Sequence, residues 1–167
     1  MAPWNARPAH SPSSTKCARR PDREEEPIRT LDPATEADAR ALERLETELM
    51  GWLTTINPDG QPQSSAIWFL WQNGEILIYS HIRAPRNANV EANPRVSFNL
   101  NTDPDGDEVV TMEGEARIDL SLPPSSANPA YQAKHRHMIE RYGWTPEWLS
   151  ANYPVPILIR PTRWRLG

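Results

Sequence analysis

The pattern of apolar and polar positions between residues 51 and 119 predicts a series of short β-strands. Residues 52–56 and 64–71 are rich in β-branched and aromatic side chains, which is typical of half-buried antiparallel strands. The intervening Asn57-Pro58-Asp59-Gly60 joins a residue of fixed φ to a glycine free to adopt positive φ, so it predicts a tight turn. A second hairpin turn is predicted at 72–74, which reads Gln-Asn-Gly. Strands are therefore expected at 51–57, 64–71, 76–80, 95–100, 108–119, 156–160 and 163–166.

Helical spacing appears on both sides of this run. An N-cap and proline pair at Asp32-Pro33 predicts the start of a helix that ends at Gly51, with one apolar face made of Leu42, Leu45, Leu49 and Met50. Pro85 and the pair Thr145-Pro146 suit the first turns of two shorter helices, and another helix is expected at 130–142. Because strands dominate and the hairpins are short, the pattern predicts a mainly β fold, a small antiparallel barrel with peripheral α-helices.

Composition divides the chain into two parts. Residues 1–30 hold five of the 18 prolines, a Ser-Pro-Ser-Ser stretch and a charged run at 22–26, so they are expected to form a disordered N-terminal tail. Residues 31–167 are long enough for one domain. The folded domain is therefore expected to span 31–167.

Charge and cysteine content exclude several classes of function. The net charge of −4 gives no electrostatic support for nucleic-acid binding, and no apolar run approaches the roughly 20 residues of a membrane-spanning helix. A single cysteine, Cys17, and a first segment without an apolar core predict a cytoplasmic protein. No metal site is expected: the acidic loop 101–107 lacks the twelve-residue calcium pattern, and His135 and His137 point about 200° apart on a helix.

A basic segment at 81–90, broken by Pro85, is the strongest candidate for ligand binding. The amide hydrogens that follow Pro85, together with Arg83, Arg86 and the side chain of Asn87 or Asn89, form a candidate anion site. The alternative is that the two arginines are a solvated surface pair. The chain has no phosphate-binding glycine loop, no dinucleotide fingerprint and no nucleophile elbow, so we assign no catalytic residue and expect a cofactor to carry the chemistry.

Five short motifs in combination resemble the split β-barrel flavin and deazaflavin proteins, the pyridoxamine-phosphate-oxidase-like superfamily. They are the hairpin turn at 57–60, Ile67-Trp-Phe69, Tyr79-Ser80, Asn93-Pro-Arg-Val-Ser97 and the ending Arg160-Pro-Thr-Arg-Trp164. The resemblance covers most of 35–166 and is strongest to the branch that uses coenzyme F420. It implies a mainly β split β-barrel, antiparallel and Greek-key-like, of the FMN-binding type.

The resemblance also implies a set of cofactor-binding positions. Arg86 occupies the place of the family's phosphate-binding Lys or Arg, and Asn89 closes the same motif. Two positions differ from the family: Ala88 replaces a basic residue and Ala66 replaces a proline, and Arg83 can compensate from the other side of Pro85. The slot for the ring is expected to be lined by Ser65, Ala66, Ile67 and Trp68 from one strand and by Tyr79 and Ser80 from the other.

By this resemblance the protein is expected to be an F420-dependent oxidoreductase that transfers hydride between the cofactor and a small unsaturated or quinone-like substrate. FMN is the alternative cofactor within the same fold. A non-catalytic protein that binds a tetrapyrrole, a lipid or a stored cofactor is the second class of function. The resemblance further implies a homodimer with cofactor at its interface. Seven tryptophans fit an aromatic interface, or else ordinary packing.

Overall fold

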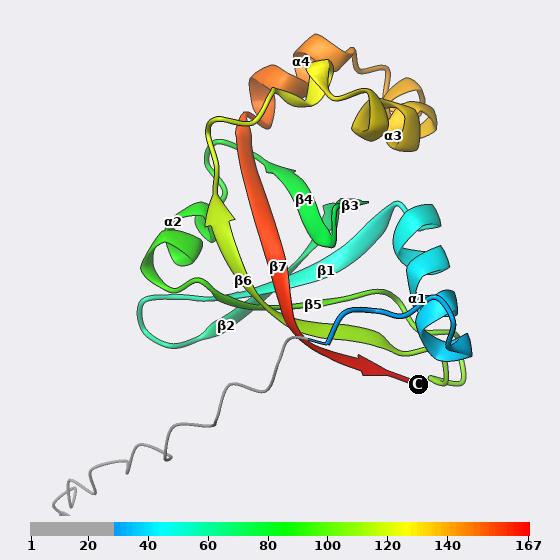
Figure 1. Ribbon diagram of the computed structural model, residues 1–167. Coiled ribbons are helices and arrows are strands. Elements are labelled where there is room, and N and C mark those ends of the chain that lie inside the picture. Colours follow the sequence, from blue (N-terminus) through cyan, green and yellow to red (C-terminus); the bar gives the residue numbers. More distant parts are fainter. Residues whose placement is uncertain (1–28) are drawn as a thin grey trace, which may run out of the picture.

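A computed structural model describes residues 29–167, so the expected disorder of residues 1–30 falls almost entirely outside the described residues (Figure 1). Seven antiparallel strands form one curled sheet in the order β2-β1-β5-β6-β7-β4-β3. The strands are β1 (Met50–Ile56), β2 (Pro62–Trp68), β3 (Leu70–Gln72), β4 (Glu75–Ser80), β5 (Arg95–Asn99), β6 (Val110–Ile118) and β7 (Val155–Leu166). This is a split β-barrel, and the predicted fold class is confirmed.

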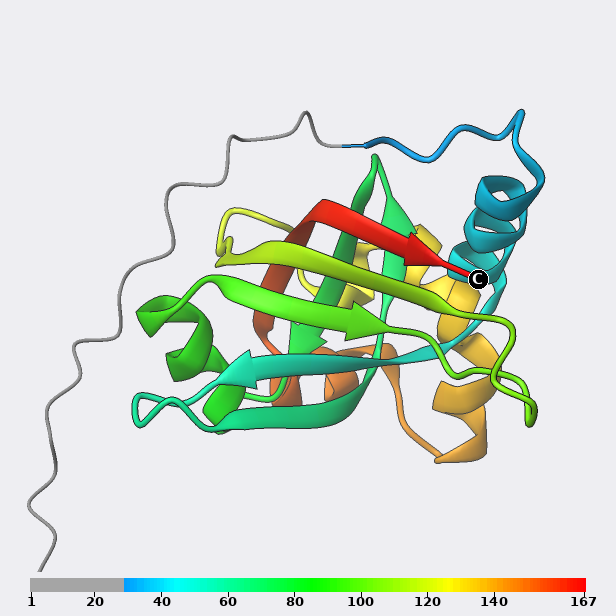
Figure 2. The ribbon, with the colours of Figure 1, turned by 90° about the horizontal axis from the view of Figure 1, so that it is seen from below.

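Four α-helices lie around the sheet. They are α1 (Glu36–Thr47), α2 (Pro85–Ala92), α3 (Pro129–Arg141) and α4 (Pro146–Asn152), with a short 3-10 turn at Ser125–Ala127 before α3. Figure 1 shows α3 and α4 together beyond one end of β4 and β7, with α2 and α1 at opposite ends of the barrel. Seen from below in Figure 2, β2, β1, β5, β6 and β7 follow one another as the curled part of the barrel.

Three of the predicted strands differ in continuity from the strands of the structure. The stretch 64–71 is divided at Phe69, so that it contributes to both β2 and β3. The two expected C-terminal strands are instead one strand, β7. Its register against β6 shifts between Glu113 and Gly114, which places Thr162 in a bulge beside Pro161. A bulge accommodates a proline that cannot donate to the ladder, so the proline does not end the strand.

The first helix begins later than the sequence predicts, at Glu36 instead of after Asp32. Oδ1 of Asp32 accepts from the N–H of Ala34, which closes a turn and leaves Thr35 as the N-cap residue. The carboxylate of Asp38, buried on this helix, accepts from the Asp32 N–H at 2.9 Å and pairs with Arg29. The segment before the helix is therefore fixed by a buried acid.

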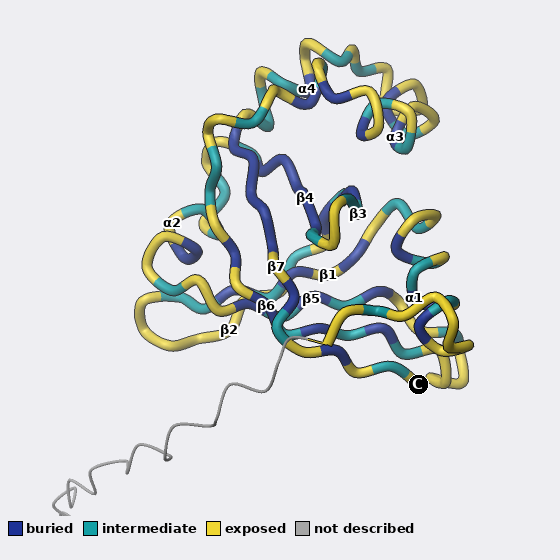
Figure 3. The backbone as a smooth tube through the Cα atoms, viewed as in Figure 1, coloured by how far each residue is buried: buried dark blue, intermediate teal, exposed yellow. Residues whose placement is uncertain are grey.

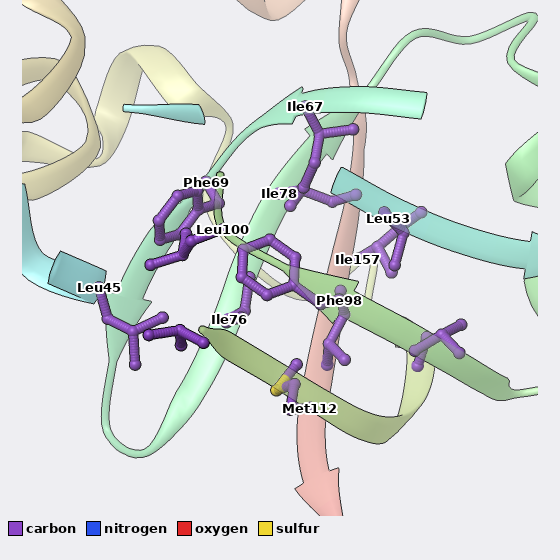
Figure 4. Close-up of a cluster of buried hydrophobic side chains, with 14 of the residues drawn as sticks. Leu45, Leu53, Ile67, Phe69, Ile76, Ile78, Phe98, Leu100, Met112 and Ile157 are labelled. Atoms are coloured by element: carbon purple, nitrogen blue, oxygen red, sulfur yellow. The ribbon is translucent and has the colours of Figure 1, made fainter. Parts of the chain in front are cut away.

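Two groups of buried side chains hold the fold together. The larger fills the barrel, where the rings of Phe69 and Phe98 lie edge to face with centroids 5.1 Å apart (Figure 4). The smaller, which includes Tyr79, Tyr131 and Leu149, joins α3 and α4 to the outer side of β4. Figure 3 shows β4 as buried, whereas α3 and α4 expose their outer sides. Among the described residues, no helix is long and apolar enough to cross a membrane.

The candidate functional site

A pocket of about 310 Å³ lies between the β2–β4 side of the sheet and the pair α3–α4. Side chains of the strands line it on one side. On the other side it is lined by the segment 129–153, which holds α3 and α4 and which we call the helical cap. The sheet and the segment after β4 supply Met50, Ala66, Ile67, Trp68, Tyr79, His81 and Arg86, and the helical cap supplies Tyr131, Tyr142, Trp144, Leu149 and Tyr153. None of these lining residues is an aspartate or a glutamate, so the pocket favours an anionic or neutral ligand.

Arg86 is the cation of this pocket. Pro85 occupies the first turn of α2, which places Arg86 next to it at the helix N-terminus. Nη1 of Arg86 donates to the hydroxyl of Ser80, 3.3 Å away. Desolvation lowers the pKa of Arg86 from its ordinary value. Within 29–167 no carboxylate pairs with this guanidinium, although six other arginines form ion pairs. A half-buried guanidinium without an acidic partner is suited to bind an anion.

Aromatic rings form the opposite wall. The ring of Trp144 lies 5.8 Å from that of Trp68 and stacks on Tyr142 at 4.9 Å. Behind it, Trp148 stacks on Trp144 at 4.5 Å without lining the pocket. These rings give the pocket an aromatic surface of the kind that planar ligands contact.

The inner side of the pocket carries two tyrosines. The Tyr79 hydroxyl donates to the carbonyl oxygen of Pro123 at 2.9 Å and accepts from Nδ2 of Asn128 at 3.4 Å. The ring of Tyr131 meets that of Tyr79 edge to face at 4.8 Å. Burial raises the pKa of both phenols, so both remain protonated at neutral pH.

Two neighbouring residues of α3 fasten the cap to the sheet. Nε2 of His135 contacts the carbonyl oxygen of Phe69 at 3.1 Å, and its imidazole stacks on Trp68 with an interplanar angle of 12°. Nζ of Lys134 donates to the carbonyl oxygen of Leu45 at 2.8 Å and lies over the Phe69 ring. Burial lowers the pKa of His135 to about 4 and that of Lys134 to about 8. These contacts set the position of the pocket wall.

The structure brings five of the predicted cofactor-binding residues together around one pocket: Ala66, Ile67, Trp68, Tyr79 and Arg86. Ser80 is buried and reaches the site through its hydrogen bond from Arg86. Ser65, Arg83 and Pro85 do not line the pocket, and the latter two are exposed at the surface. Their role in binding stays a prediction.

Asn89 has a different set of contacts from those that the phosphate prediction requires. It is buried, and its Nδ2 group lies 3.0 Å from Thr55 Oγ1 and 3.1 Å from Asn57 Oδ1, both in the β1–β2 hairpin. The two amide hydrogens are thereby taken up by the protein. In this arrangement Asn89 ties α2 to the hairpin and so places Arg86.

Most of the helical-cap residues that line the pocket were not predicted from the sequence as ligand contacts. Tyr131, Tyr142, Leu149 and Tyr153 lie far along the chain from the strands that they face, and no local periodicity points to that contact. One signal was available, the close spacing of aromatic residues between 142 and 153. His81 also lines the pocket, and its Nδ1 accepts from the backbone N–H of Arg83.

In the described part of the chain, no group of three His, Cys, Asp or Glu residues is arranged to hold a metal ion. In the acidic loop, Asp103 Oδ1 accepts from the N–H of Asp107 at 2.7 Å and from that of Glu108 at 3.3 Å. These hydrogen bonds lower the pKa of Asp103. The carboxylate therefore has a structural role in closing the loop.

Comparison with known proteins agrees with this architecture. The family described as pyridoxamine 5'-phosphate oxidase matches residues 37–165, and the chain belongs to this family. It is similar to a solved F420 reductase, with 28% identity, a TM-score of 0.55, and coverage of 74% of this chain and 94% of that one. A conserved hypothetical protein from Mycobacterium tuberculosis has 27% identity and a TM-score of 0.57, covering 78% and 84% of the two chains.

A more distant likeness concerns the fold alone. The heme storage protein HutZ from Vibrio cholerae has 18% identity and a TM-score of 0.57, and the likeness covers 79% of this chain and 95% of that one. No curated protein sequence matches the chain.

Proposed function

We propose that the protein is an oxidoreductase that uses the deazaflavin coenzyme F420 and transfers hydride between it and a small unsaturated or quinone-like substrate. Membership of a flavin-type oxidoreductase family supports the reaction class. The likeness to an F420 reductase supports the choice of cofactor.

The observation that carries the proposal is the guanidinium of Arg86, which pairs with no carboxylate of residues 29–167 and lines the same pocket as the aromatic rings. A flavin or deazaflavin joins a planar tricyclic ring to a phosphate through a short polyol chain. The pocket offers a cation at one side, the rings of Trp68 and Trp144 at another, and no carboxylate in its lining. The residues present therefore fit the group in charge and in shape.

The work of the protein in this reaction is to bind and align. Arg86 neutralises the phosphate, and Ser80 orients the guanidinium through the hydrogen bond that it accepts. Trp68 and Trp144, whose rings lie 5.8 Å apart, would give the cofactor ring an aromatic surface to lie against and so limit its orientation. When bound, the cofactor supplies the hydride.

Two alternatives share the pocket. FMN has the same ring-and-phosphate layout, and the lining residues do not discriminate against it. A tetrapyrrole would need an axial ligand, for which His81 is the histidine in the lining. Its Nδ1 accepts from Arg83 N–H at 3.1 Å, so the neutral imidazole carries its proton on Nε2, the nitrogen left to bind iron. Binding iron through Nε2 would therefore require the other tautomer and the loss of this hydrogen bond.

The proposal includes a homodimer whose second copy covers the site. Met50 and Trp52 are 39% and 41% exposed on the outward face of β1, next to Ala66 of β2, which pairs with Trp52. Met50 and Ala66 also line the pocket, so a copy docked on this face would close it. Trp52→Glu should shift the mass measured by light scattering from dimer to monomer and weaken cofactor binding.

The test is a fluorescence titration of the full-length protein with F420, with FMN and with haemin, each run on three proteins. Wild type should bind F420 with micromolar or lower Kd. Arg86→Ala should weaken binding at least tenfold, about 1.4 kcal/mol. Arg95→Ala removes an exposed arginine outside the pocket and should bind as wild type does. Tight binding of FMN alone would change the cofactor, and binding of haemin alone would overturn the proposal.

A further inference from the structure

The hydroxyl of Tyr131 is a polar group that no other residue within 29–167 hydrogen-bonds. Tyr131 lies in the first turn of α3, only 2% exposed, between the rings of Tyr79 at 4.8 Å and His135 at 4.4 Å. Its backbone N–H donates to Asn128 Oδ1, yet its phenolic hydroxyl has no hydrogen-bond partner within residues 29–167. Because no protein group within 29–167 uses this hydroxyl, it is available to hydrogen-bond a ligand.

This hydroxyl is open to the pocket. Within 29–167, two side-chain polar atoms are both sealed from solvent and without a hydrogen-bond partner: Asn87 Oδ1 and His135 Nδ1. The Tyr131 hydroxyl also lacks a partner but is not among these sealed atoms. It therefore touches open space, and the space that the Tyr131 side chain borders is the pocket. The neighbouring Tyr79 hydroxyl differs, because Pro123 and Asn128 already satisfy it.

The phenol can act only in its protonated form. Burial, with smaller contributions from the phenols of Tyr79 and Tyr153, raises the pKa of Tyr131 far above neutral. A phenol that stays protonated presents a donor hydrogen at every physiological pH. Its natural partner is an oxygen that accepts strongly, such as the carbonyl of a conjugated ring.

We propose that the Tyr131 hydroxyl donates a hydrogen bond to a ring carbonyl oxygen of the ligand and so selects for planar, oxygen-bearing ring systems. This inference rests on the function proposed above. The same chemistry occurs in two possible sources, the dione edge of the cofactor ring and the carbonyl of a quinone or enone acceptor. In either case Tyr131 is a contact and specificity residue that works from the side of the pocket formed by α3.

The test compares Tyr131→Phe with Tyr79→Phe in the full-length protein. Three measurements are made on each variant: urea unfolding in the absence of ligand, binding titrations with F420 and with FMN, and the steady-state rate of menadione reduction by reduced F420. Tyr131→Phe keeps the ring and loses only the unpartnered hydroxyl, so its unfolding midpoint should equal or exceed that of wild type. Tyr79→Phe loses two hydrogen bonds to the protein, so its midpoint should fall.

The two sources separate in the binding and kinetic arms. If the hydroxyl contacts the cofactor, Tyr131→Phe should raise the cofactor Kd at least fivefold. If it contacts the acceptor, the cofactor Kd should stay unchanged and kcat/KM for menadione should fall at least fivefold.

Three outcomes would overturn the inference. Destabilisation of Tyr131→Phe as large as that of Tyr79→Phe would mean that the hydroxyl has a structural partner. If Tyr131→Phe bound the cofactor and reduced menadione as wild type does, the proposed contact of the hydroxyl would be ruled out, and the proposed function would still stand. Failure of wild type itself to bind F420 or FMN would remove the proposed function, and the inference with it.

Discussion

The imidazole of His135 and the carbonyl oxygen of Phe69, 3.1 Å apart, join the helical cap to the point where β2 ends and β3 begins. The acceptor is a carbonyl, so the nitrogen that meets it, Nε2, must carry a proton. Nδ1, sealed and without a partner, is then the unprotonated nitrogen of a neutral ring. Because the same ring stacks on Trp68, this one contact fixes both the cap and the pocket wall.

This arrangement predicts an acid-sensitive fold. Burial lowers the pKa of His135 from 6.5 in the unfolded chain to about 4. Between pH 6.5 and 4 the His135 side chain is protonated in the unfolded state but neutral in the folded state. The free energy of unfolding should therefore fall as the pH is lowered from 6.5 to 4. The largest possible loss from this group is about 3 kcal/mol. Urea unfolding at intervals of half a pH unit measures it.

Two variants isolate the contribution of His135. His135→Gln keeps a donor for the Phe69 carbonyl but does not titrate, so its stability should change less than that of wild type over the same pH range. His137→Gln, at an exposed position of the same helix, should follow the wild-type curve. Equal slopes for wild type and His135→Gln would assign the acid sensitivity to other groups. The nearest cation is Lys134, whose charge opposes protonation of the ring.

Asn89 is predicted to act on ligand binding through structure. Asn89→Asp keeps the shape of the side chain and removes both donor hydrogens from Thr55 and Asn57. The loss of these buried hydrogen bonds should lower the free energy of unfolding by about 1–3 kcal/mol. F420 affinity should fall with it, because α2 carries Arg86. A variant with wild-type stability and weak binding would instead assign Asn89 a direct contact with the phosphate.

Local signals were sufficient to predict where the strands lie, but not the break at Phe69 or the continuity of β7. The hairpin turns depend on residues that adopt positive φ, and the structure has Gly60 at 87°, Asn73 at 53° and Gly74 at 76°. Such conformations are chosen by one or two residues, so a sequence pattern reveals them. The alternation of β6 likewise appears as buried Val110 and Met112 between more exposed neighbours.

The helices of the cap were predicted from the sequence, but their position against the sheet could not be. The contact between His135 and Phe69 joins residues 66 positions apart, and neither residue differs locally from any histidine or phenylalanine in an apolar segment. The buried face of α3 is visible in its periodicity, but periodicity does not identify the surface that it meets. For the same reason, five of the residues predicted to bind the cofactor line the pocket, whereas no pocket residue of the helical cap was predicted to bind it.

Gly51 is predicted to be required by the close approach of a ring. A Cβ atom at this position of β1 would lie 2.3 Å from Cζ of Phe98, a fully buried side chain of the barrel core. Gly51→Ala should therefore lower the free energy of unfolding by about 1–3 kcal/mol. Phe98→Leu removes the ring, so adding Gly51→Ala to it should cost less than adding it to wild type. Additive losses in this double-mutant cycle would show that Phe98 is not the obstacle.

Trp144 is predicted to bind the ring of the ligand and not its phosphate. It lines the pocket, whereas Trp148 stacks behind it and does not. Trp144→Ala should weaken F420 binding about tenfold, near 1.4 kcal/mol, because it removes a stacking surface. Inorganic phosphate should still compete with F420 in this variant, with an inhibition constant close to that of wild type, since Arg86 is unchanged. Trp148→Ala should weaken F420 binding less than threefold. If Trp148→Ala and Trp144→Ala lost affinity equally, the wall would act by supporting the cap, and the ring of Trp144 would have no contact of its own with the ligand.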